Sequence, residues 1–334
     1  MKIYCTHNFP EHTFARKIIL FLCSVPMFLF THIGAANENN ICSRTAKLAH
    51  SACLNETLDD YQIAKGKCLN SSDGGEKIEC IADAKEEKSE MKDLCREQQF
   101  ARRDVCDLIG ESAYDPEFEP EIFMTATQMA DSPNPYFPLV PGTQWVYAKG
   151  DDETIMVEVL DEFKLIEGVE CRTVRDTVTV DIEGEDVLVE DTLDWYAQDV
   201  DANVWYCGEI SRNYEFIPED GVAELVDLEG SWKAFRDGAK PGIVMFANPA
   251  VGTVYRQEFD LGNAEDVAEI ISISDTATAM VGSCTGDCLV TRDFTPVDPG
   301  HEELKVYSPG FGMILEFDPE TNEVIAELIE MTTP

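Results

Sequence analysis

Apolar and polar residues alternate with a period of two over most of the chain, from about residue 142 to residue 331. The alternating segments are separated by turn-forming stretches such as residues 182–186 and 318–322, which contain glycine, proline, aspartate and asparagine. This pattern is typical of antiparallel strands joined by hairpins, and it predicts about a dozen strands with no long helix. Because so large a sheet curls or closes to protect its edges, we expect a mainly β domain, a large antiparallel meander sheet or barrel-like fold.

A different pattern precedes the sheet, between residues 41 and 110. This segment lacks proline, is rich in helix-forming residues and contains six cysteines with successive separations of 11, 15, 12, 15 and 11. The three nested pairs share a centre at Gly74, inside the turn-forming segment 71–75. At about 100° per residue, these separations place the cysteines of each helix on one stripe. We therefore predict a helical hairpin with the disulfides Cys42–Cys106, Cys53–Cys95 and Cys68–Cys80.

Metal binding is the alternative for six cysteines. The C-x2-C spacing of zinc sites is absent, however, and the only nearby histidine is His50. Disulfides suit a pair of helices that can bury little apolar surface by themselves. The role of the hairpin stays open, since a spacer, a partner-binding arm and an oligomerisation element all fit.

The N-terminus has the features of a secretory signal peptide. Arg16 and Lys17 precede an apolar run at residues 18–30, and small residues follow up to Ala36. A membrane anchor is the alternative, but a run of about 13 residues is short for a bilayer that needs about 20. No later segment could span a membrane. We expect cleavage after Ala36 and a secreted or periplasmic protein.

Six prolines and several acidic residues fill residues 111–141, where they break up any helix. This composition predicts a semi-extended acidic linker. The predicted organisation is therefore a signal peptide (1–36), a stapled hairpin (37–110), the linker (111–141) and an antiparallel β-domain (142–334).

Ten of the twelve cysteines remain after cleavage, and an even number in an exported chain favours disulfides. Four of them lie in the predicted β-domain. We expect Cys171 to pair with Cys207, on separate strands, and Cys284 to pair with Cys288 around Gly286. The C-x3-C spacing of the latter pair differs from the C-x-x-C of redox-active sites.

Several motifs resemble an uncharacterised family of exported bacterial proteins. The motifs are N-P-Y-F-P-L-x-P-G-T-x-W-V-Y at residues 134–147 and D-W-Y-A-Q at 194–198, with further matching segments at 203–206, 229–232, 238–243 and 255–258. Residues 103–116 also resemble the segment that precedes this domain in some members. The resemblance implies export from a bacterial cell and no established activity. Cys207 and Cys284 are additions to the usual pattern.

The chain has 65 acidic and 25 basic residues, a formal net charge of −40. Such a balance argues against binding to nucleic acid, which depends on concentrated lysine and arginine, and against anionic membranes. Cations, basic proteins and cationic ligands remain compatible partners, and a merely solubilising surface is the simpler explanation.

The sequence assigns no catalytic residue and no cofactor. His301 is the only histidine of the predicted β-domain, so a Ser-His-Asp or Cys-His site lacks further candidates for its base, and no G-x-S-x-G or phosphate-binding loop occurs. No acidic pair stands out for glycoside hydrolysis. Residues 199–203 match the opening of an EF-hand loop, but the later ligands are missing, and we interpret them as a turn. Weak calcium binding by the acidic surface stays compatible.

Aromatic residues are the best remaining indication of a ligand. They either fill the core of the sheet, which we favour, or line a cavity for an apolar or sugar-like ligand. Arg256 lies in a domain poor in basic residues, where it would pair with a buried acid or hold a ligand carboxylate. The candidate lining residues are Trp145, Trp195, Trp205, Trp232, Tyr255 and Arg256.

Together these features favour an exported, acidic, non-enzymatic binding or structural protein. A carrier that holds an apolar ligand in a curved β-sheet is the first alternative, and a carboxylate-based hydrolase is the second. A protein partner or a small apolar ligand fits the chain, without insertion into a membrane. The oligomeric state is not specified by the sequence.

Overall fold

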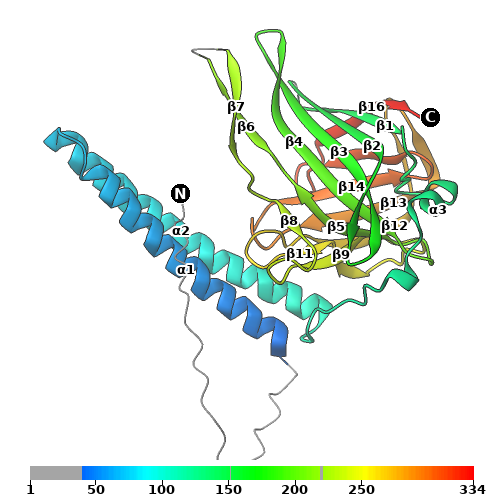
Figure 1. Cartoon of the computed structure of the whole chain (residues 1–334), viewed down its shortest axis with the longest axis horizontal. Helices are drawn as coiled ribbons and strands as arrows, with labels where there is room; N and C mark the ends of the chain where they lie inside the picture. Colours follow the sequence, from blue (N-terminus) through cyan, green and yellow to red (C-terminus); the bar gives the residue numbers. More distant parts are fainter. Residues whose placement is uncertain (1–39, 151, 219–220) are drawn as a thin grey trace, which may run out of the picture. The chain divides into compact units, whose positions relative to one another are not determined.

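Two long antiparallel helices form the hairpin that the cysteine pattern predicts (Figure 1). Helix α1 spans Ile41–Cys68 and helix α2 spans Gly74–Ile109. The carboxylate of Asp73 accepts hydrogen bonds from the backbone N–H groups of Gly75 (2.7 Å) and Glu76 (3.0 Å), which fixes the start of α2. The structure is a computed structural model that describes residues 40–150, 152–218 and 221–334, so the predicted signal peptide lies outside the described residues.

The three predicted inter-helix disulfides are confirmed. Cys42–Cys106, Cys53–Cys95 and Cys68–Cys80 join the helices with Cα–Cα distances of 5.6, 5.8 and 5.6 Å. Large apolar side chains of both helices face solvent, among them Leu48 (69% exposed) and Ile78 (74%). Because the helices bury so few apolar side chains, the disulfides supply much of what holds them together.

The segment after the hairpin contains more structure than its prolines suggest. It includes a 3-10 turn at Pro120–Ile122 and helix α3 at Ala126–Asp131. Our prediction that prolines prevent any helix here is wrong, because the stretch between Pro120 and Pro133 is proline-free and Thr125 with Gln128 forms a capping box. Five of its apolar side chains are buried, namely Phe118, Phe123, Ala126, Met129 and Leu139.

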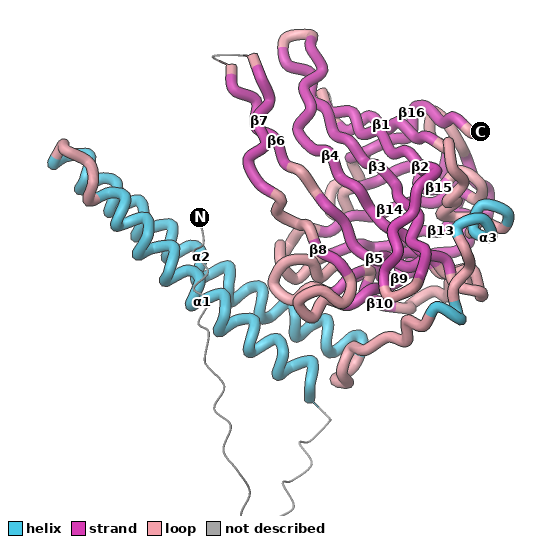
Figure 2. Tube along the Cα trace, in the orientation of Figure 1, coloured by secondary structure: helices cyan, strands magenta, loops and turns pink. Residues whose placement is uncertain are grey.

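Sixteen strands form one large sheet in which the pairings are antiparallel, as the alternating pattern predicts (Figure 2). Along the main path the strands pair in the order β10-β12-β13-β14-β15-β16-β1-β2-β3-β4-β5-β9-β11, and β6, β7 and β8 branch from β4 and β5. The bounds are β1 Gln144–Lys149, β2 Glu153–Ile166, β3 Val169–Ile182, β4 Glu185–Gln198, β5 Val204–Ile210, β6 Asn213–Ile217, β7 Val222–Asp227, β8 Trp232–Lys233, β9 Lys240–Met245, β10 Val254–Arg256, β11 Glu258–Phe259, β12 Val267–Thr278, β13 Ser283–Phe294, β14 Glu302–Ser308, β15 Gly312–Phe317 and β16 Val324–Thr332.

Two tight turns show how the sequence sets the strand register. Glu183 and Gly184 link β3 to β4 with φ values of 58° and 89°, and Glu167 and Gly168 link β2 to β3 with 46° and 88°. Two consecutive residues with positive φ form the hairpin turn whose twist matches the strands. Glycine at the second position of both turns carries the larger φ without a steric penalty.

The sheet curls until strands from its two ends meet. A Cβ atom added to Gly242 of β9 would lie 2.4 Å from the backbone carbonyl of Gln257, directly after β10. Strand β10 begins the path of paired strands and β9 lies near its other end. Curling of this kind limits the exposed edges of a large sheet.

Two apolar clusters make up the core. The larger lies within the curled sheet and includes Trp145, Tyr147, Ile270, Leu289 and Leu328. The second contains three tryptophans together with two aromatic residues of segment 111–141, and includes Trp195, Trp205, Trp232, Phe118 and Phe123. The part of the chain that the structure describes has no helix that is both long and apolar enough to cross a membrane.

Of the two disulfides predicted in the β-domain, one is present. Cys284 bonds to Cys288, whereas Cys171 and Cys207 are free, fully buried thiols. The prediction of a Cys171–Cys207 bond is wrong because β4 lies between their strands β3 and β5. Backbones two strands apart are separated by about 9.5 Å, beyond the roughly 7 Å that a disulfide spans. Burial raises the pKa of Cys207 well above its usual range, and the neighbouring Cys171 adds to the effect.

We therefore expect two cryptic thiols in a chain produced without residues 1–36, which contain Cys5 and Cys23. A thiol reagent should label neither Cys171 nor Cys207 in the folded protein, because burial both hides the sulfur atoms and disfavours the thiolate. Unfolding without a reductant should expose two reactive thiols per chain, counted by mass spectrometry. The Cys171→Ala variant should expose one. A count of zero in the unfolded wild type would show that the pair is bridged.

Candidate functional site

A cavity of about 290 Å³ lies against the larger core cluster, between β1–β4 on one side and β14–β15 on the other. Most of its wall is apolar or aromatic, and four ionisable side chains complete it. The aromatic residues are Phe137, Trp145, Tyr147, Tyr196 and Tyr307. The ionisable residues are Asp176, Asp194, Lys305 and Glu316.

Two aromatic residues of the wall have their polar atoms hydrogen-bonded to the protein backbone. The indole N–H of Trp145 donates to the carbonyl of Phe311 (2.5 Å), and the Tyr147 hydroxyl donates to the carbonyl of Met313 (3.1 Å). Burial also raises the pKa of the Tyr147 hydroxyl far above its ordinary value. These rings therefore present apolar surface to the cavity, which suits an apolar or aromatic ligand group.

Two aspartates on neighbouring strands form the polar part of the wall. Asp194 of β4 is 7% exposed, and one carboxylate oxygen accepts a hydrogen bond from the Tyr206 hydroxyl (2.5 Å). Burial raises the pKa of Asp194 to about 7, and the nearby Glu190 adds to the rise. Asp176 of β3 has a buried Oδ1 with no hydrogen-bond partner among the described residues. Burial, reinforced by Asp194 and Glu190, raises the pKa of Asp176 well above its ordinary value.

More acids extend this group away from the cavity. Burial raises the pKa of Glu209 to about 8, with Asp194 contributing, and raises the pKa of Glu258 well above its usual range. The buried Oε2 of Glu258 also lacks a hydrogen-bond partner within the described ranges. Carboxyl groups that share a water-poor region without basic partners favour their protonated forms.

Lys305, the basic residue of the cavity wall, is engaged by other acids. Its ammonium group lies 3.2 Å from a carboxylate oxygen of Glu303 and 3.5 Å from one of Asp293. Burial lowers the pKa of Lys305, but the two carboxylates outweigh burial and hold its pKa well above the ordinary value. Its charge is therefore compensated away from Asp176 and Asp194.

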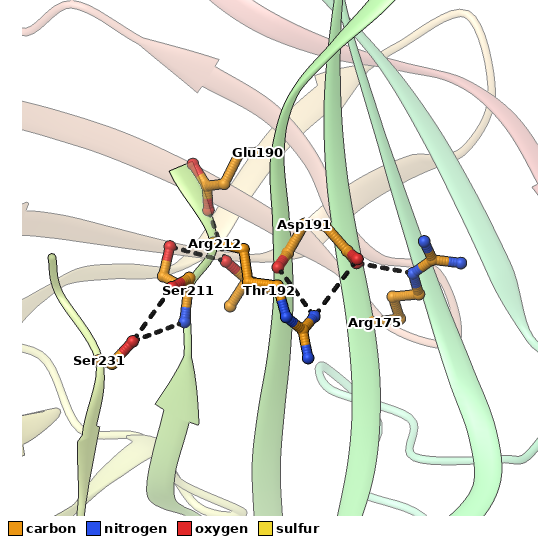
Figure 3. A network of polar contacts seen from close by, with 7 residues as sticks. All are labelled: Arg175, Glu190, Asp191, Thr192, Ser211, Arg212 and Ser231. Atoms are coloured by element: carbon orange, nitrogen blue, oxygen red, sulfur yellow. Dashed lines mark hydrogen bonds and ion pairs between the residues drawn. The ribbon is translucent and has the colours of Figure 1, made fainter. Parts of the chain in front are cut away.

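Figure 3 shows the contacts of two nearby basic residues, Arg175 of β3 and Arg212, which lies between β5 and β6. The carboxylate of Asp191 accepts from the guanidinium groups of Arg175 (2.7 Å) and Arg212 (3.3 Å). Successive side chains of a strand point to opposite faces, so Asp191 and Arg175 lie on the face opposite Asp194 and Asp176. Both arginines therefore neutralise the carboxylate of Asp191 on the opposite face of the sheet. They do not serve as basic partners for Asp176 or Asp194.

The raised pKa values predict a pH dependence of stability. A buried carboxyl with a raised pKa holds its proton in the folded state at pH values where the unfolded chain has released it. The stabilisation is thus fully present below about pH 4, the unfolded pKa, and is lost as pH rises through the folded values of about 7 for Asp194 and about 8 for Glu209. We expect the free energy of unfolding to fall between pH 4 and about 8.

Denaturant titrations across that range test this expectation, with the double variant Asp194→Asn/Glu209→Gln as the comparison. The variant should have a shallower decline, because two of the titrating groups are gone. An unchanged slope would mean that these carboxyls ionise normally in the folded protein.

The six residues proposed from the sequence separate into three places. Trp145 lines the cavity described above. Trp205, Tyr255 and Arg256 line a different cavity of about 290 Å³ beside the end of α2. Trp195 and Trp232 are buried in the second core cluster.

Sequence reasoning missed Asp176, Asp194 and Tyr307. The alternation within residues 190–196 places Asp194 on the same face as Tyr196, which is a usable signal. The predicted turn at residues 182–186 implies that β3 pairs with β4, but the register that brings Asp176 beside Asp194 is not visible in the sequence.

The segment with EF-hand character is a turn between β4 and β5. Both oxygens of the Asp199 carboxylate accept hydrogen bonds from protein donors, including the backbone N–H of Asn203 (2.9 Å) and the indole N–H of Trp205 (2.9 Å). Within residues 40–150, 152–218 and 221–334, no three His, Cys, Asp or Glu side chains are grouped as a metal site would require.

Comparisons with known proteins give no further indication of function. No protein-family model, no curated protein and no solved structure matches the chain. The resemblance to exported bacterial proteins stays an expectation drawn from the motifs.

Proposed function

We propose that this is an exported, non-enzymatic binding protein whose β-domain holds a small amphipathic ligand with a basic nitrogen. The observation that carries the proposal is the cavity of about 290 Å³, in which an aromatic wall meets the buried Asp194 and the buried Oδ1 atom of the half-buried Asp176. A buried carboxyl oxygen without a partner is costly, and a ligand that donates to it removes the cost. Four disulfides support a protein that works outside the cytoplasm.

The charge of the site defines the polar end of the ligand. A protonated amine near Asp176 and Asp194 favours their ionised forms and forms charge-assisted hydrogen bonds. A net charge of −40 also concentrates cations near the protein and repels anions.

The size of the cavity limits the rest of the ligand. Its volume lies near the lower end of ligand pockets, which span about 300–1,000 Å³. A single ring or a short alkyl chain therefore suits the space between Trp145, Tyr147 and Tyr307.

Calorimetric titration with phenethylamine tests the proposal, and phenethyl alcohol serves as the neutral comparison of matched shape. We expect the amine to bind at least about tenfold more tightly, as one charge-assisted hydrogen bond would provide. The double variant Asp176→Asn/Asp194→Asn should lose this preference. Asp191→Asn removes a carboxylate from the opposite face and should keep it. Equal affinities in the wild type, or a preference that survives the double variant, would contradict the proposal.

A carboxylate-based hydrolase is the second candidate, because Asp176 and Asp194 line the same cavity. Glycosidases need one protonated and one ionised carboxyl group. Burial raises the pKa of both aspartates, which disfavours the ionised partner that the mechanism needs. Binding is therefore the better supported function.

A further inference from the structure

We propose a second ligand site, for a small organic carboxylate, formed by Arg256 and Arg102 at the end of the hairpin. This site uses a cavity and residues different from those of the proposed amine site. It is built around one buried carboxylate and two buried guanidinium groups, whose charges do not balance.

Arg102 and Glu265 form the compensated part of the site. Arg102 of α2 is 4% exposed and Glu265 is fully buried. The Nε of Arg102 donates to both carboxylate oxygens of Glu265 (2.9 and 3.1 Å), and its Nη2 lies 2.8 Å from Oε1. Glu265 also accepts from the backbone N–H of Gly262 (2.8 Å). The negative charge of Glu265 is thus neutralised by Arg102, which contacts the carboxylate through two of its nitrogen atoms.

Arg256 is the uncompensated cation. It is 6% exposed, and no hydrogen bond or ion pair joins its guanidinium group to a residue that the structure describes. Its guanidinium carbon instead lies 4.3 Å from the ring centre of Phe259 and 5.7 Å from that of Tyr114. The sequence offered a buried acid or a ligand carboxylate as its partner. The nearby Glu265 attracts Arg256 electrostatically, but its carboxylate is already hydrogen-bonded to Arg102. Removing a guanidinium group from water without a counter-charge is costly.

The neighbouring space can hold an anion and an apolar body. A cavity of about 170 Å³ is lined by Arg102, Glu265 and Arg256 together. Arg256 and Tyr114 also line the cavity of about 290 Å³, whose further wall includes Trp205, Ile243 and Tyr255. Among the described residues, the buried Nη1 atoms of both arginines and the Nε of Arg256 have no hydrogen-bond partner. Two guanidinium groups and one carboxylate leave one positive charge, which a monoanion neutralises.

A planar carboxylate matches the fork of guanidinium N–H groups and accepts two hydrogen bonds from it. The aromatic and aliphatic wall then suits an apolar body attached to the carboxylate. The geometry points to a small aromatic or branched aliphatic acid as the ligand class.

Thermal unfolding of the full mature chain with benzoate tests the site, and benzamide is the neutral comparison of the same shape. At about ten times its Kd, benzoate should raise the Tm by about 3 °C or more, and benzamide should not. The Arg256→Gln variant should lose the benzoate shift. Without ligand, its Tm should equal or exceed that of the wild type, because an uncompensated buried charge is removed. The Asp176→Asn/Asp194→Asn variant should keep the benzoate shift, which separates this site from the amine site.

Two results would overturn the proposal. The first is an equal or absent response of the wild type to benzoate and benzamide. The second is a ligand-free Arg256→Gln protein with a clearly lower Tm, which would make Arg256 a structural cation.

Discussion

Reduction of the inter-helix disulfides is expected to abolish most of the helical signal while the β-sheet stays folded. Helices α1 and α2 leave many large apolar side chains in solvent and bury few, so contacts between them contribute little. Removal of one native disulfide from a small module costs about 2–5 kcal/mol, and here three are lost together. The sheet has its own two apolar clusters, and its single disulfide closes a loop of only four residues.

Far-ultraviolet circular dichroism follows the helices, and tryptophan fluorescence follows the sheet, because all four tryptophans lie outside the hairpin. A reductant should decrease the helical signal with little change in tryptophan emission. The Cys284→Ser/Cys288→Ser variant is the control, and it should keep its helices until reductant is added. Helices that persist after full reduction would show that side-chain packing alone holds the hairpin.

The Gly242→Ala variant is expected to be strongly destabilised. An added Cβ would lie 2.4 Å from the carbonyl carbon and oxygen of Gln257 and 2.5 Å from the carbonyl oxygen of Arg256. Because these are backbone atoms, β9 and the backbone after β10 would have to move apart to make room for the Cβ. Overpacking typically costs about 1–3 kcal/mol, and a displaced backbone places this variant at about 3 kcal/mol or more.

Gly66→Ala provides the matched control, since nothing lies within 4 Å of a Cβ at Gly66 inside α1. Alanine there should stabilise the helix by about 0.5–1 kcal/mol. Denaturant titration measures both variants. A Gly242→Ala protein as stable as the wild type would mean that β9 and the backbone after β10 do not meet as closely as described.

The sequence predicted those features that depend on local periodicity. The symmetric spacing of the cysteines about Gly74 is enough to pair three disulfides, because helical geometry converts spacing directly into direction. Alternation with a period of two likewise identified a large antiparallel sheet. In both cases the structural feature follows from a regular spacing of residues along the sequence.

Features that depend on strand register and on packing in three dimensions could not be predicted. Cys171 and Cys207 are free because β4 separates their strands, an order that consecutive hairpins imply and that the predicted disulfide did not take into account. Asp176 and Asp194 meet because β3 pairs with β4 in one particular register. Arg256 was identified from the scarcity of basic residues, but its lack of an acidic partner depends on the packing of α2 beside β10.

In the proposed function, the β-domain encloses a ligand with a basic nitrogen between its aromatic wall and the pair Asp176 and Asp194. Native mass spectrometry of the protein purified from its own source tests this most directly. We predict one small nitrogen-containing molecule bound per chain, retained by the Asp191→Asn variant and lost from the Asp176→Asn/Asp194→Asn variant. A wild-type protein with only its unliganded mass, or a ligand that the double variant retains, would contradict the claim.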